Sequence, residues 1–141
     1  MRKEAVTQID KYIAFKTAHQ TITQYRSSNN FLAAYVITFS LIEDRLRAIF
    51  VVWHRDTKGG DPKSYVGFTK IVNQLCKVGL ISEGDANLLR AEAIKRNELL
   101  HSAMWNLPVF TDKEVERAMS LARMIDKYRR AQKKLREKSK K

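Results

Sequence analysis

Cysteine, proline and glycine are scarce in this sequence, which has one Cys, two Pro and five Gly among 141 residues. The single thiol, Cys76, cannot form an intramolecular disulfide, and no second cysteine or close histidine pair offers the spacing of a zinc site. Low glycine and proline content also excludes a collagen-like chain. The chain must therefore be stabilised by a hydrophobic core, and it is long enough to form one as a single domain without cofactors.

Long apolar runs are lacking as well. The longest nearly apolar stretch, 31–42, is much shorter than the ~20 residues that a membrane-spanning helix needs. The N-terminal segment MRKEAVTQIDKY has no apolar region of the signal-peptide kind. We therefore expect a cytoplasmic protein, in a reducing compartment, that does not associate with a membrane.

Acidic residues are outnumbered by basic ones, 15 to 27, which gives a formal net charge of +12. The excess is concentrated in residues 129–141, RRAQKKLREKSKK. Such a block is often a solvated helix end or a disordered extension, and the alternative is a segment that attracts the phosphates of nucleic acid. If it binds RNA, the contacts are expected from Arg129, Arg130, Lys133, Lys134 and Arg136.

Apolar residues recur every three or four positions through most of the chain, and no stretch alternates as a half-buried strand does. This pattern predicts helices at about 4–25, 31–55, 62–78, 83–105 and 112–128. The second should be the central core helix, because it carries a continuous apolar seam of Phe31, Tyr35, Phe39, Ile42, Leu46, Ile49 and Trp53. The predicted fold class is all-α: a single up-and-down bundle of about five helices over residues 1–128, followed by a basic C-terminal tail at 129–141.

The expected helix ends carry residues that favour caps. Asn and Ser side chains in 27–30 should cap the second helix, Pro62 should occupy the first turn of the third, and Gly79 should end it. Beyond Tyr128, only Ala131 and Leu135 could pack. Two pairs have the spacing of a capping box, in which a hydroxyl and a carboxylate satisfy backbone N–H groups: Ser82 with Asp85, and Thr111 with Glu114.

One segment, AIKRNELLHS at 93–102, has a charged residue on the apolar face of its predicted helix. On a helical wheel Arg96 falls inside the apolar arc, while Asn97 and His101 lie along one edge. A guanidinium there is costly unless an anion or a polar interface meets it, and an amide four residues from a histidine can orient the imidazole. The alternative is an ordinary helix-surface ion pair between Arg96 and Glu92, with His101 as a boundary residue.

The hexapeptide RNELLH, from Arg96 to His101, resembles the R-polar-x(3–5)-H signature of HEPN domains. These are small helical bundles, many of which are metal-independent ribonucleases in toxin and antiviral systems. The polar residue after the arginine adds specificity, since the similarly spaced Arg47 and His54 lack it. The segment SLIEDRL at 40–46 resembles the family's corresponding helix, and the resemblance covers residues 5–128. This chain departs from one subgroup, which has a tyrosine where Ala103 stands.

The resemblance implies RNA cleavage by attack of a 2′-hydroxyl on the adjacent phosphate, without a metal or cofactor. His101 would transfer the proton, Arg96 would bind the phosphate, and Asn97 would orient His101 or hold a phosphate oxygen. Glu43 on the second helix is a further candidate, whose alternative role is an ion pair with Arg47. The setting implied is a toxin–antitoxin or antiviral defence system, in which an antitoxin or regulatory protein would restrain the activity.

The motif supplies one histidine per chain, whereas the reaction needs both an acid and a base. We therefore expect a homodimer that brings two copies of the motif together, as the family does. Two alternatives stay open: a non-catalytic helical module that binds RNA or another protein, and nucleotide binding without cleavage.

Overall fold

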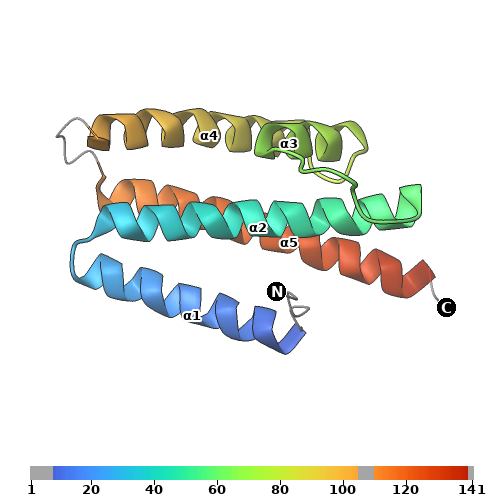
Figure 1. Cartoon of the computed structure of the whole chain (residues 1–141), viewed down its shortest axis with the longest axis horizontal. Coiled ribbons are helices and arrows are strands. Elements are labelled where there is room, and N and C mark those ends of the chain that lie inside the picture. The colour runs from blue at the N-terminus through green and yellow to red at the C-terminus, as the bar shows by residue number, and fades with distance from the viewer. Residues whose placement is uncertain (1–7, 105–109, 140–141) are drawn as a thin grey trace.

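The computed structural model describes residues 8–104 and 110–139 of the chain. Within these residues there are five helices and no strand, which confirms the predicted all-α bundle. Four long helices alternate in direction along the bundle, and the short α3 lies beside the first part of α4 (Figure 1). Helices α2 and α5 form the centre, with α1 on one side and α3 with α4 on the other. The helices are α1 (Gln8–Ser27), α2 (Phe31–Lys58), α3 (Phe68–Lys77), α4 (Glu83–Met104) and α5 (Asp112–Ser139).

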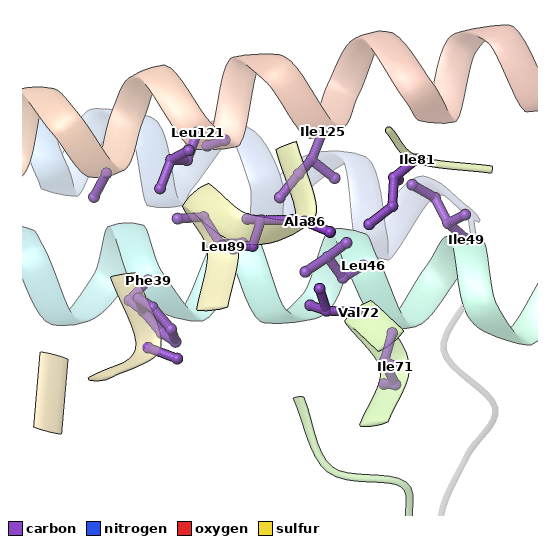
Figure 2. Close-up of a cluster of buried hydrophobic side chains, with 14 of the residues drawn as sticks. Phe39, Leu46, Ile49, Ile71, Val72, Ile81, Ala86, Leu89, Leu121 and Ile125 are labelled. Carbon is purple, nitrogen blue, oxygen red and sulfur yellow. The ribbon is translucent and has the colours of Figure 1, made fainter. Parts of the chain in front are cut away.

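The hydrophobic core lies between α2 and its neighbours (Figure 2). Most of the predicted seam of α2 is buried, and only its two end residues, Phe31 and Trp53, are partly exposed. Side chains from every other helix pack against this seam, so α2 is the central core helix, as predicted. The buried apolar residues of α3, α4 and α5 are Ile71, Val72, Leu75, Ala86, Leu89, Ala93, Val115, Ala118, Leu121, Ala122 and Ile125.

The third helix begins at Phe68, so the prediction that Pro62 occupies its first turn was wrong. Helix α2 instead runs on to Lys58 and ends at Gly59, whose φ of 80° is the left-handed conformation that favours glycine. The loop that follows is held back against α2 by side-chain contacts. His54 Nδ1 lies 2.5 Å from the carbonyl oxygen of Gly60, and Arg55 forms an ion pair with Asp61.

The predicted caps are largely confirmed. Asn30 accepts a hydrogen bond from the Ala33 N–H at 3.3 Å, and Thr111 donates its backbone N–H to Glu114 Oε2 at 2.8 Å. The cap at Ser82 has a tertiary partner. The Ser82 hydroxyl accepts a hydrogen bond from the Asp85 N–H at 3.1 Å. The Ser82 N–H donates to the hydroxyl of Tyr128 on α5, and that hydroxyl donates to the Asp85 carboxylate. The start of α4 is therefore tied to α5.

Helix α5 continues eleven residues past the predicted end, from Tyr128 to Ser139. Ala131 and Leu135 are exposed and Gln132 is buried, so the prediction that only Ala131 and Leu135 could pack beyond Tyr128 was wrong. The face of α5 that meets α2 continues instead through Gln132, which is buried and donates from Nε2 to the carbonyl oxygen of Ile49 at 3.0 Å. None of the described helices is long and apolar enough to cross a membrane.

Candidate functional site

Arg96 on α4 contacts two side chains of α2, Glu43 and Phe39, and its own neighbour Asn97. Its Nη1 donates to Glu43 Oε1 at 2.9 Å, and its guanidinium carbon lies 4.3 Å from the centre of the Phe39 ring. Its Nε and Nη2 donate to Asn97 Oδ1 at 3.3 and 3.2 Å. The side chains of Arg96 and Glu43 are 25% and 34% exposed, so a solvent molecule or ligand can reach the pair. The structure thus brings together three of the four predicted catalytic residues.

In place of the two alternative helix-surface ion pairs, the structure has contacts with other helices and with the loop after α2. Glu92 is only 3% exposed and accepts from the Tyr35 hydroxyl at 2.7 Å, and from Arg117 Nε and Nη2 at 2.6 and 3.0 Å. It therefore pairs with Arg117 of α5 instead of Arg96. The guanidinium of Arg47, the alternative partner of Glu43, lies 4.7 Å from the centre of the exposed ring of Tyr65.

The buried carboxylate of Glu92 lies one helical turn before Arg96 on α4. Its hydrogen bonds to α2 and α5 therefore hold the part of α4 that carries Arg96. Burial and the hydrogen bond to Glu92 raise the pKa of Tyr35 above its ordinary range, so the phenol stays protonated. The hydrogen bonds to Glu92 also raise the pKa of Arg117. This network joins α4 to α2 and α5. Sequence analysis missed it, although Glu92 also falls inside the apolar arc of α4, which is a signal for a paired buried charge.

Asn97 and His101 are exposed on α4. The amide oxygen of Asn97 accepts two hydrogen bonds from the Arg96 guanidinium. The orientation of His101 by Asn97 stays a prediction. His101 follows Arg96 by five residues, near the C-terminal end of the helix. The apolar side chain of Ile94, which is 61% exposed, shares this face, since it precedes Asn97 by three residues and His101 by seven.

The basic residues predicted to bind RNA lie on the last turns of α5, away from Arg96. Helices α4 and α5 are antiparallel, so their C-terminal ends lie at opposite ends of the bundle (Figure 1). From Asp112 to Lys133, α5 rises roughly 30 Å. Lys133 and Lys134 are exposed, whereas Arg136 donates from Nε and Nη2 to Asp56 of α2 at 2.9 and 3.2 Å.

Among the described residues, no three His, Cys, Asp or Glu side chains gather as a metal-binding site requires. Comparison of the chain with protein-family models, with curated proteins and with solved structures finds no match. Fold and site define an all-α helical bundle with an arginine–glutamate–asparagine cluster between α2 and α4 and a strongly basic end of α5.

Proposed function

We propose that the protein is a metal-independent endoribonuclease of HEPN type, which cleaves RNA to 2′,3′-cyclic phosphate and 5′-hydroxyl ends. The observation that carries this proposal is the fixed guanidinium of Arg96 on the same helix as the exposed His101. Glu43, Asn97 and Phe39 hold that guanidinium before any substrate arrives, and a preorganised donor is the kind that stabilises a transition state most.

The chemistry needs a proton carrier and a phosphate ligand. The 2′-hydroxyl oxygen attacks the adjacent phosphorus while its proton passes to the imidazole of His101. The bond from phosphorus to the 5′-oxygen breaks, and that oxygen takes a proton from an imidazolium. Arg96 has five N–H donors, of which Glu43 and Asn97 use three, so two are available to a phosphate oxygen as its charge grows.

A homodimer supplies the second imidazole that this chemistry uses. The exposed Ile94 supports self-association, since an apolar side chain on the same face as Asn97 and His101 would be covered by a second copy of α4. The one cleft between the two chains would then hold an acid from one chain and a base from the other. In a toxin–antitoxin or antiviral role, an antitoxin or regulatory protein would act by covering this face.

The proposal is tested by incubating purified protein with single-stranded RNA in EDTA and analysing the ends of the products. We expect cyclic phosphate and 5′-hydroxyl ends, and a loss of about a hundredfold or more in rate for Arg96→Ala and for His101→Ala. Lys95→Ala is the matched control, because it removes an exposed cation next to Arg96. All variants should keep their helical circular dichroism. Wild-type rates in both Arg96→Ala and His101→Ala would reject the assignment.

The second candidate is a non-catalytic module that binds RNA. It is favoured by the ion pair itself, because Glu43 neutralises Arg96 and the ring of Phe39 gives the guanidinium a purely structural contact. In that case the RNA ends stay unchanged in the assay above, while RNA affinity is the same in wild type and His101→Ala.

A further inference from the structure

A groove of about 580 Å³ lies between the C-terminal half of α2 and the outer side of α3. Its volume is in the range of pockets that hold small ligands or parts of larger ones. The elements that line it, α3 and the last part of α2, lie toward the end of the bundle where α2 and α5 finish (Figure 1). Along α2 it is roughly 20 Å from Phe39, on which Arg96 rests, so it is separate from the site described above.

The α2 wall of the groove is aromatic. Phe50, Trp53 and His54 follow one another at helical spacing, with ring centres 5.7 Å apart for Phe50 and Trp53, and 6.3 Å for Trp53 and His54. Phe50 is buried beneath, whereas Trp53 and His54 are half-buried. Because the carbonyl of Gly60 can only accept, His54 Nδ1 carries a proton and donates to it. The imidazole is thereby fixed in orientation beside the indole.

The α3 wall is cationic and rich in amides. Lys70, Asn73, Gln74 and Lys77 repeat every three or four residues on one face of α3, and Lys58 at the end of α2 adds a third ammonium. None of the described side chains that line the groove is acidic.

Asn73 has a fixed orientation within this wall. Arg90 of α4 donates to Asn73 Oδ1 at 2.8 Å. With its oxygen turned toward Arg90, Asn73 keeps its NH₂ end for another acceptor.

A row of lysines on a helix is usually a solvated face, but here it stands opposite half-exposed rings across an open volume. We propose that this groove holds one unit of a single-stranded RNA, with a base against Trp53 and His54 and the flanking phosphates at Lys70 and Lys77. Aromatic rings interleaved with cations are the usual means of holding a single strand, because bases stack on the rings and phosphates meet the ammonium groups.

The neighbouring end of α5 favours a strand over a free nucleotide. Arg136 forms its ion pair with Asp56, two residues before Lys58, so the basic last turns of α5 lie at the same end of the bundle as the groove. A polyanion can follow that surface into the groove, and a mononucleotide gains nothing from it. The inference deepens the proposed function by naming where the RNA strand is held, and it rests on RNA as the ligand, with no requirement for cleavage.

The test follows the fluorescence of Trp53 in full-length protein with Trp105→Phe, which leaves one tryptophan, and His101→Ala, which removes the proposed cleavage. The probes are an oligoadenylate RNA and adenosine monophosphate, titrated at several salt concentrations. In this background, Lys70→Gln with Lys77→Gln should weaken oligoadenylate binding about tenfold and lower the slope of log affinity against log salt by about 1.4, that is about 0.7 for each lost phosphate contact.

The matched control is Lys113→Gln with Lys127→Gln, which removes two exposed lysines of α5 outside the groove. The control variant should lose less than half as much log affinity for oligoadenylate as the groove variant does. Saturable quenching by oligoadenylate, with the larger loss in the groove variant, supports the inference. Equal losses in the two variants, or no quenching by RNA, overturn it. Binding of adenosine monophosphate as tight as that of oligoadenylate also overturns it, because the groove would then be a site for a free nucleotide. Rates measured without the His101→Ala change test the proposed cleavage separately.

Discussion

At the scale of single residues, burial decides which of two glutamates is the partner of Arg96. Glu92 has the helical spacing for that pair, but such a pair contributes only about 0.2–0.5 kcal/mol. Its carboxylate is buried and needs hydrogen-bond donors, which Tyr35 and Arg117 supply. Charge-assisted hydrogen bonds inside the protein outweigh a surface ion pair, so Glu92 turns inward and Glu43 meets Arg96.

Replacing this buried carboxylate should be costly. We expect Glu92→Gln to lower the free energy of unfolding by about 2–4 kcal/mol, because Arg117 loses its counter-ion and one donor then faces the NH₂ group of the new amide. Unfolding in guanidinium chloride, followed by far-ultraviolet circular dichroism, measures the change. Glu98→Gln is the control: Glu98 is exposed on the same helix, and its replacement should cost less than about 0.5 kcal/mol. Equal stability of the two variants would contradict the structural role of Glu92.

At the scale of the element, the last part of α5 combines two roles on two faces. Its inner face contacts α2 through Gln132 and Arg136, so removal of everything after Tyr128 would take away structural contacts together with charge. Its outer face carries Lys133 and Lys134, which are exposed. Point substitutions can therefore separate RNA binding from stability, which a truncation cannot.

We expect the two faces of α5 to respond differently to substitution. Lys133→Gln with Lys134→Gln should leave the melting temperature unchanged and reduce the salt slope of RNA binding by about 1.4 if both lysines meet phosphates. Gln132→Ala should instead lower the free energy of unfolding by about 1 kcal/mol, since the buried carbonyl loses its side-chain donor, and leave RNA affinity intact. Thermal unfolding and binding at several salt concentrations give both readouts. The reverse pattern would mean that the exposed lysines have no part in binding RNA.

At the scale of the whole molecule, the proposed cleavage site and the basic surfaces lie toward opposite ends of the bundle. His101 is in the last turn of α4. The C-terminal end of α4 lies at the opposite end of the bundle from the C-terminal ends of α2 and α5 (Figure 1), and the end of α2 forms one wall of the groove. A net charge of +12 attracts RNA to the molecule as a whole. A strand held at the groove would have to extend along the bundle, or across to a second copy, to reach His101.

The proposed homodimer gives a prediction at this scale. Light scattering should give about twice the 16.4 kDa of one chain, and Ile94→Lys should produce a monomer with little cleavage, because a charge on that face opposes its burial. Leu88→Lys is the control, since Leu88 is 54% exposed on a different face of α4 and its replacement should leave the dimer intact. A wild-type monomer with full activity would show that one histidine per site is enough.

Several features follow from the sequence alone because they depend on residues within one or two helical turns. The apolar period of three and four predicts α2 and its buried seam, and the caps at Asn30 and Thr111 form with backbone groups two or three residues away. The charge concentrated after residue 128 is likewise a property of the sequence. Local propensity and spacing are sufficient for such features, whatever the rest of the chain does.

Only the tertiary structure decides the partners of the buried and half-buried charges. Arg96 meets Glu43, 53 residues earlier in the chain, and Glu92 meets Tyr35 and Arg117 on two other helices. No helical spacing encodes those pairs, because they depend on which faces of α2, α4 and α5 pack together. The tertiary structure also decides where α5 ends. The helix continues past Tyr128 because its inner face finds contacts on α2 there. Burial sets these outcomes, since an enclosed charge must take whichever donor or acceptor the packing brings to it.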